Sequence, residues 1–262
     1  MQAMINHLRS RFGNSLDGLG QITLLGNEAL VSLLRRRWEA SHLLYQTYFI
    51  GIKSLSVVLI TGAFTGMVLC AQTYFQFHKV RMDTATLAVV SVSMCSELGP
   101  VLSGLMVAGR VGAAMAAELG TMKVTEQIDA LRALATHPVD YLVVPRILAT
   151  TLAMPLLTTC SICVGIGAGY VVGVTLLGID PAYAWHNMVR YTSSEDVVMG
   201  LIKSVIFGAL ISLIGCFKGL NCQQGAEGVG KATTEAVVFS SITILISNFF
   251  LTLLLTRIFT AE

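Results

Sequence analysis

The chain has 262 residues, of which 54% are hydrophobic and 12% charged, and its mean hydropathy is +0.73. Soluble domains carry about twice this charged fraction, so the composition excludes an ordinary soluble protein and predicts an all-α, polytopic integral membrane protein. The formal net charge is +2 and the cations are dispersed, which excludes a basic stripe of the kind that binds nucleic acid.

The first 44 residues predict an amphipathic helix that lies on the membrane surface. Apolar residues recur close to helical spacing between positions 16 and 34, and the basic and aromatic segment Arg35–Trp38 follows. Such a helix suits the membrane–water interface; a peripheral soluble helix is the alternative. The beginning lacks the pattern of a cleaved signal peptide. We therefore expect an interfacial region at residues 1–44 and a transmembrane domain at residues 45–262.

Five later stretches predict transmembrane helices, because about 20 apolar residues cross the roughly 30 Å hydrocarbon layer. Lys203 interrupts the fourth of them. If the chain starts in the cytoplasm, twelve of its 17 Lys and Arg residues lie at or near that side, as the positive-inside rule requires, and the C-terminus lies outside. The predicted spans are Gly51–Ala71, Thr84–Ala117, Ile147–Leu177, Val197–Phe217 and Ala236–Phe259.

Glu97 stands beside the helix-weakening pair Gly99 and Pro100 inside the second predicted span. An intramembrane carboxylate is costly, and such residues usually line a substrate or ion path. Proline also frees a backbone carbonyl that a cavity or a neighbouring helix must satisfy. Two roles follow: Glu97 lines a central cavity, or it is the structural partner of a cation, with Lys53, Arg110 and Lys203 as candidates. Spacing also allows an ion pair between Glu118 and Arg110.

The polar segment between the second and third spans predicts a short helix over Thr125–Leu134. Thr125 can cap it, Glu126 and Asp129 favour its positive N-terminal end, and His137–Pro138 ends it. Its apolar positions, spaced three residues apart, share one face, and Arg132 adds a further charge. Such a helix could receive a push from a protein outside the membrane; a solvated connector is the alternative.

The third span is followed by the turn Gly178–Pro181 and then by Tyr183, Trp185 and Tyr191, which predict a short interfacial helix. Glycines four residues apart in the first and third spans (Gly62 and Gly66; Gly165, Gly169 and Gly173) predict close helix packing, either within one chain or between two copies.

Several apparent motifs do not indicate catalysis or metal binding. Cys160 and Cys163 have redox spacing, but they lie mid-span without a second pair, so we interpret them as buried apolar residues. The segment Gly225–Lys231 spells a phosphate-loop pattern but lacks the following Ser or Thr and a preceding strand. We interpret it as a flexible turn before the last span, with Thr233 or Thr234 as its cap. We expect no catalytic residue, no metal and no cofactor in this chain.

The chain resembles the Mla-type (MlaE/YrbE) permeases, the membrane subunits of ATP-driven lipid transporters in bacterial envelopes, which have a chloroplast-envelope relative. The resemblance runs from about Tyr45 to the C-terminus and rests on several separated motifs in the right order. These motifs are Gly62–Leu69, Glu97–Pro138, Tyr141–Arg146 and Gly228–Thr234.

This resemblance implies a homodimer that moves phospholipid between the inner and outer membranes and maintains outer-membrane lipid asymmetry. The implied partners are a cytoplasmic ABC ATPase that binds ATP and a periplasmic MCE-domain lipid-binding protein, and the implied location is the bacterial inner membrane. Segment 125–134 would be the coupling helix. The lipid path would include Glu97, Leu69, Tyr74 and Phe77. An ion-coupled secondary transporter using Glu97 and a non-transporting assembly subunit are the alternatives.

Overall fold

The structure, a computed structural model, describes residues 20–33 and 40–259. The described residues contain five helical stretches long and apolar enough to cross a membrane, which confirms the five predicted spans. The stretches are longer than predicted because their helices continue beyond the apolar residues. They cover Leu43–His78, Asp83–Val124, Val139–Thr175, Ser194–Leu220 and Gly225–Phe259.

Short π-helical turns interrupt the first two spans, and another one begins the third span. The first consists of α2 (Ala40–Thr47), η1 (Tyr48–Ile52) and α3 (Lys53–His78). The second begins with the 3-10 turn η2 (Asp83–Ala85) and continues as α4 (Thr86–Ser93), η3 (Met94–Leu98), α5 (Gly99–Val107), η4 (Ala108–Gly112) and α6 (Ala113–Val124). The third consists of η5 (Val139–Val143) and α8 (Val144–Thr175).

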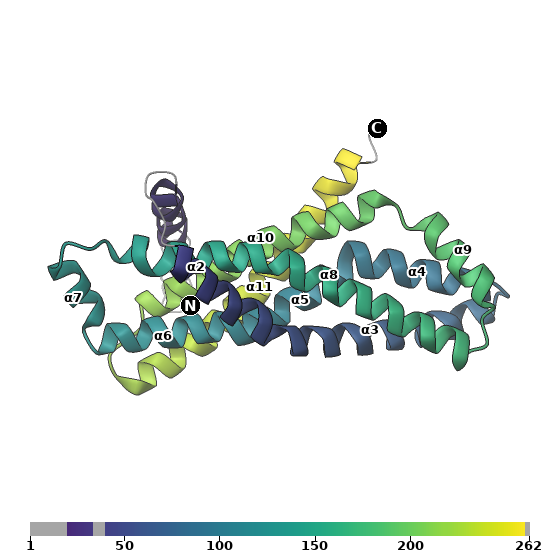
Figure 1. Ribbon diagram of the computed structural model, residues 1–262, viewed down its shortest axis with the longest axis horizontal. Coiled ribbons are helices and arrows are strands. Elements are labelled where there is room, and N and C mark those ends of the chain that lie inside the picture. The colour runs from purple at the N-terminus through teal and green to yellow at the C-terminus, as the bar shows by residue number, and fades with distance from the viewer. Residues whose placement is uncertain (1–19, 34–39, 260–262) are drawn as a thin grey trace, which may run out of the picture.

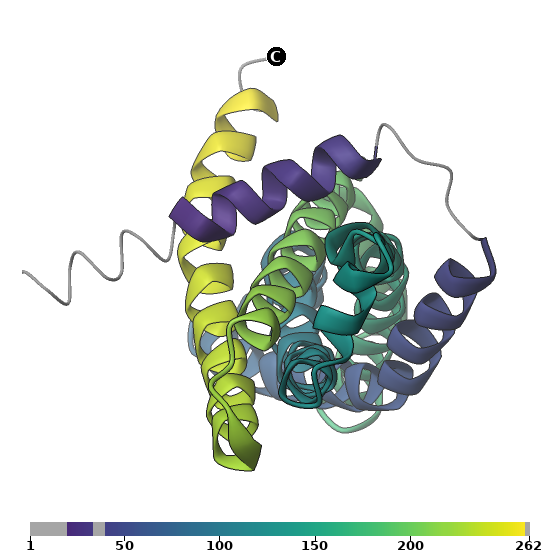
Figure 2. The same cartoon turned by 90° about the vertical axis from the view of Figure 1, so that its left-hand side faces the viewer.

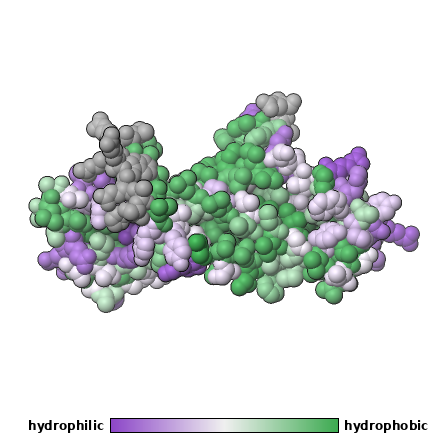
Figure 3. All heavy atoms as spheres, viewed as in Figure 1, coloured by the Kyte–Doolittle hydropathy of each residue, from purple (hydrophilic) through white to green (hydrophobic). Residues whose placement is uncertain are grey.

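The remaining spans are α10 (Ser194–Leu220) and α11 (Gly225–Phe259). Figure 1 shows an elongated bundle with α7 (Gln127–Ala133) at one end and α9 (Pro181–Tyr191) at the other. In Figure 3, hydrophobic residues cover the middle of the visible face and hydrophilic residues gather towards both ends. This pattern is the one that a bilayer-spanning bundle requires.

The predicted glycine packing occurs within the chain, between α3 and α8. A Cβ atom added to Gly66 would collide with the backbone of Gly165, and one added to Gly62 would collide with Ser161. A Cβ atom added to Gly169 would be 3.1 Å from the Gly66 carbonyl, which is a tight contact rather than a collision. The glycine faces therefore let two spans of one chain approach closely, and small residues serve this purpose in membranes.

A helix formed by residues 20–33 lies across the α7 end of the bundle, as the view onto that end shows (Figure 2). Ala29 is buried in the core, and Leu25 and Leu33 pack against it. Leu24 and Leu30 are exposed instead. Apolar side chains therefore point both into the bundle and away from it. The segment Arg35–Trp38 lies outside the described residues, and the interfacial role of residues 1–44 stays a prediction.

Two local predictions at the ends of the spans have different outcomes. A short helix after the third span is present as α9, where the Asp180 carboxylate accepts hydrogen bonds from the backbone N–H groups of Ala182 and Tyr183. The flexible turn before the last span was wrong, because α11 begins at Gly225. Thr233 and Thr234 lie inside this helix and donate to the Gly230 carbonyl instead of capping it.

Candidate functional site

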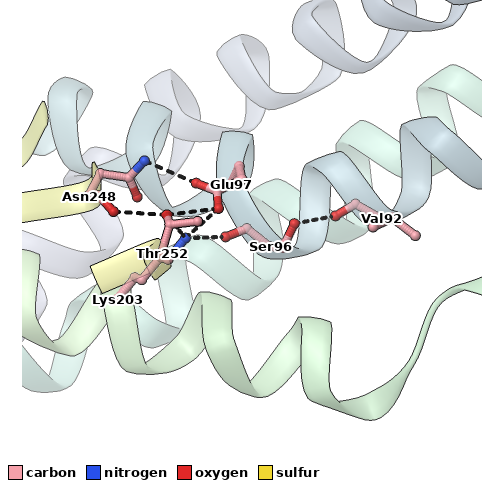
Figure 4. A network of polar contacts seen from close by, with 6 residues as sticks. All are labelled: Val92, Ser96, Glu97, Lys203, Asn248 and Thr252. Atoms are coloured by element: carbon pink, nitrogen blue, oxygen red, sulfur yellow. Dashed lines mark hydrogen bonds and ion pairs between the residues drawn. The ribbon is translucent and has the colours of Figure 1, made fainter. Parts of the chain in front are cut away.

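Glu97 lies in a polar network that joins three spans inside the apolar bundle (Figure 4). The Lys203 ammonium is 2.7 Å from Glu97 Oε1, and Thr252 Oγ1 donates to the same oxygen at 2.9 Å. Asn248 Nδ2 donates to Glu97 Oε2 at 3.0 Å. The network therefore connects η3, α10 and α11 through one carboxylate.

Pro100 explains why Lys203 also binds a backbone carbonyl in addition to the Glu97 carboxylate. Proline has no N–H, so it cannot donate to the carbonyl four residues earlier, which belongs to Ser96. Lys203 Nζ donates to this carbonyl at 3.0 Å and to Thr252 Oγ1 at 2.9 Å. The ammonium thus satisfies a backbone oxygen that the helix leaves free, as a membrane interior requires.

A close approach between α10 and η3 places Lys203 in this position. A Cβ atom at Gly200, one helical turn before Lys203, would collide with the backbone carbonyl of Cys95. Only glycine allows the two helices to approach this closely. Lys203, which interrupts the fourth predicted span, is therefore buried between the helices. The apolar environment is tolerated because the ammonium has three hydrogen-bond acceptors.

The two members of the ion pair differ in access to the surroundings. The Lys203 side chain is 1% exposed, whereas the Glu97 side chain is 36% exposed. Asn248 Oδ1 is buried and has no hydrogen-bond partner among the described residues. The site therefore combines a fully buried cation, a partly exposed carboxylate and a buried amide oxygen that has no partner among the described residues. Such a set can hold a hydroxyl or ammonium group that approaches Glu97.

Leu69, Tyr74 and Phe77 lie on α3, on a different side of the second span. Leu69 and Tyr74 pack against a buried cluster at the α9 end, which includes Leu87 and Met94. Phe77 is half-buried near the end of the helix. In this chain α3 packs against α4, α5 and α8, whereas the Glu97 partners come from α10 and α11. Among the described residues of one copy, Leu69, Tyr74 and Phe77 form no hydrogen bond, ion pair or ring contact with Glu97.

The segment predicted to be a short helix contains α7, which is two residues shorter at its beginning than the prediction. Thr125 was predicted to cap it, and this was wrong: its hydroxyl donates to the Thr121 carbonyl in the preceding helix. Glu126 precedes the helix with a left-handed backbone (φ 59°) and no side-chain cap. Asp129 pairs with Arg132 at 3.0 Å, and both side chains are exposed.

The end of α7 also differs from its prediction. The N–H groups of Ala135 and Thr136 donate to the carbonyls of Arg132 and Leu131, and Ala135 has a φ of 56°. These two hydrogen bonds, together with the left-handed backbone of Ala135, form a Schellman motif. This motif ends the helix before Pro138. Of the three apolar positions expected to share a face, Ile128 is buried, but Leu134 is 75% exposed.

Glu118 pairs with Arg146 rather than with Arg110, at a distance of 3.0 Å from Arg146 NH2. Arg146 is buried and also donates to the Leu142 carbonyl. Sequence spacing along one span favoured the nearer arginine, but packing of the third span against the second supplies the other. The expectation that Cys163 is buried was also wrong, because it is exposed on α8; all six cysteines are free.

Sequence reasoning missed Asn248 and Thr252, the two partners of Glu97 from the last span. Both are polar residues four positions apart within a predicted transmembrane stretch, so they share one helix face. These two residues and Lys203 in the fourth span could have been proposed as partners of Glu97, because isolated polar residues in spans tend to face one another. Sequence alone could not show which ones meet.

Comparison with known proteins gives consistent matches along the chain. The family model described as Permease MlaE matches residues 43–254. A probable ABC transporter permease protein of Rickettsia conorii is 44% identical over 247 residues, covering 94% of this chain and 95% of that protein. The intermembrane phospholipid transport system permease protein MlaE of Haemophilus influenzae is 36% identical over 235 residues, which cover 89% of this chain and 90% of that protein. The chloroplastic protein TRIGALACTOSYLDIACYLGLYCEROL 1 of Arabidopsis thaliana is 37% identical over 230 residues, which cover 88% of this chain and 66% of that protein.

Proposed function

The chain belongs to the MlaE permease family of ABC transporter permeases, and we propose that it moves phospholipids between the inner and outer membranes of a bacterial cell. In this proposal it maintains outer-membrane lipid asymmetry, resides in the inner membrane and works as a homodimer. The relative from Haemophilus influenzae, named for an intermembrane phospholipid transport system, supports the substrate class. A cytoplasmic ABC ATPase binds and hydrolyses ATP, and a periplasmic MCE-domain protein exchanges the lipid.

The observation that carries this proposal is the partial exposure of Glu97 within its polar network. Lys203, Asn248 and Thr252 hold the carboxylate, yet 36% of its side chain remains exposed. A lipid headgroup with hydroxyl or ammonium donors could approach the exposed part of this carboxylate. The acyl chains would lie against an apolar surface that the second copy of the chain supplies. This surface consists of its Leu69, Tyr74 and Phe77.

In this proposal the ATPase binds the exposed segment at the α7 end, and its conformational change displaces α7. Glu126, Asp129 and Arg132 offer charges to the ATPase, and Thr125 lies at the preceding helix end. Ile128 is buried in the same core cluster as residues of α6, α8 and α10. A displacement of α7 would therefore be transmitted to the spans through packed side chains, because a close-packed core resists deformation.

Reconstitution tests the proposal directly. The chain would be placed in vesicles with its ATPase and MCE-domain partners, and transfer of a fluorescent phospholipid would be followed after ATP is added. We expect transfer only with ATP and the complete set. Full transfer by the chain alone, without nucleotide, would refute an externally driven permease. Transfer that follows a proton gradient and requires no ATPase would instead support the secondary transporter with Glu97 as the proton site.

A further inference from the structure

Two cations lie beside one aromatic ring, in the halves of the first and second spans that are nearer to α7. Lys53 Nζ lies 4.6 Å from the centroid of the Phe49 ring, and Arg110 Cζ lies 5.8 Å from it. Arg110 NH1 also donates to the buried hydroxyl of Ser54 at 2.6 Å. We call Phe49, Lys53, Ser54 and Arg110 the cation cluster. Its members come from two spans, so their proximity depends on the fold.

The cluster lacks a negative partner among the described residues. The ion pairs of the described residues include neither Lys53 nor Arg110. A ring face and one hydroxyl attract these cations, but they do not neutralise two charges that repel each other. Arginine stays protonated under all ordinary conditions, so at least one full positive charge persists here. An anion bound beside these groups would offset their positive charge.

The depth of the cluster indicates which anion is available. Lys53 begins α3, whose other end is His78, so about 37 Å of helix separates the two at 1.5 Å per residue. A bilayer with its headgroups is about 40–45 Å thick. If α9 and its aromatic residues mark one surface, the cluster lies among the headgroups of the opposite leaflet. Phospholipid phosphates are the most abundant anions at that depth.

The surroundings leave room for a headgroup. Lys53 is exposed and Arg110 is half-buried, and a Cβ atom at the neighbouring Gly109 would meet no atom within 4 Å. Phe49 also lines a half-open pocket of about 450 Å³, which extends towards the α7 end past Tyr45, Gln46 and Glu118. Phe49 lies in η1 and Arg110 lies in η4, and π-helical turns are frequent at functional sites.

We propose that the cation cluster binds the phosphate of an anionic phospholipid from the leaflet at the α7 end. The pocket beside Phe49 takes the remainder of the headgroup, with the amide of Gln46 and the carboxylate of Glu118 as hydrogen-bonding groups. The site is separate from the Glu97 network and does not depend on the proposed transport function.

Native mass spectrometry of the purified chain, titrated with dioleoyl phosphatidylglycerol, tests this site. Lys53→Met removes an exposed charge and should leave the fold intact. We expect about fivefold weaker lipid binding, since one cation near an anionic surface contributes on the order of this factor. Lys53→Arg should bind like the parent. Lys231→Met, which removes an exposed cation near the start of α11, is the matched control and should also bind like the parent.

Two further measurements distinguish a lipid phosphate from a free phosphate ion as the bound anion. Dioleoylglycerol, which lacks the phosphate, should not bind at the cluster, and inorganic phosphate should not displace the lipid. If inorganic phosphate alone stabilises the parent against heat and abolishes lipid binding, the site takes a free anion and the proposal is wrong. Equal binding by the Lys53→Met and Lys231→Met proteins would overturn it. So would unchanged lipid binding together with loss of a co-purifying protein, which would assign the anion to a partner carboxylate.

Discussion

The side chain of Lys203 occupies the hydrogen-bonding position that the backbone of Pro100 leaves vacant. Pro100 cannot donate to the Ser96 carbonyl, and the ammonium of Lys203 donates to it at 3.0 Å. The same ammonium pairs with Glu97. A helix irregularity and an intramembrane charge thus satisfy each other, and both become parts of one site.

The first prediction concerns the unequal burial of this ion pair. Glu97→Leu should destabilise the chain by about 3–5 kcal/mol, because it leaves the fully buried Lys203 without its counter-charge. Lys203→Met should cost roughly half as much, because the partly exposed Glu97 keeps its bonds to Asn248 and Thr252. Chemical unfolding of the detergent-solubilised chain measures both effects. The double variant should lose less than the two single losses combined; strictly additive losses would show that the groups do not interact.

The second prediction concerns the approach of α10 to η3. Gly200→Ala should separate the helices, because its methyl group would collide with the Cys95 carbonyl. We expect lower stability and faster hydrogen exchange around Glu97. Gly167→Ala is the matched control on a neighbouring span, since its Cβ would meet no atom within 4 Å and alanine favours helix by about 0.5–1 kcal/mol. Similar melting temperatures for the two variants would contradict the tight contact.

The third prediction concerns the glycine contact between α3 and α8. Gly66→Ala should destabilise the chain by about 1–3 kcal/mol, the usual cost of overpacking, because its Cβ would collide with the Gly165 backbone. The loss should be independent of protein concentration, since the contact lies within one chain. Thermal unfolding at several concentrations checks this. A loss confined to dilute samples would instead place the glycine faces between two copies.

The fourth prediction separates the charge of Glu126 from its backbone conformation. Its left-handed φ of 59° costs about 1–2 kcal/mol for a residue with a Cβ. Glu126→Gly should therefore stabilise the turn between α6 and α7 while removing the charge, whereas Glu126→Gln removes the charge alone. If the carboxylate couples the chain to its ATPase, both variants should reduce ATP-dependent lipid transfer. Reduced transfer in the glutamine variant alone would argue against the carboxylate.

The fifth prediction extends this test to the charge pattern. The double reversal Glu126→Lys and Asp129→Lys should uncouple lipid transfer from ATP hydrolysis and leave the melting temperature of the chain nearly unchanged, because both side chains are exposed. Arg132 loses its partner in this variant, but an exposed ion pair contributes only about 0–1 kcal/mol. Arg132→Gln is a control for loss of the pair. Unchanged coupled transfer in the double variant would exclude this surface.

The sequence by itself determined the number of spans, because long apolar stretches have no stable alternative to membrane helices. It also indicated the importance of Glu97, since a carboxylate beside Gly99 and Pro100 in such a stretch is costly wherever it points. The glycine spacing likewise indicated close helix contact. These properties depend on composition and on spacing along a single helix, which the sequence contains directly.

Only the tertiary structure decided which residues meet. Three cations were possible partners of Glu97, and the close contact at Gly200 selects Lys203. Arg146 rather than Arg110 pairs with Glu118 because the third span packs against the second. The helix limits around α7 also differed, since left-handed residues at Glu126 and Ala135 set them. Contacts between spans depend on rotation and depth of whole helices, and a single sequence does not fix either quantity.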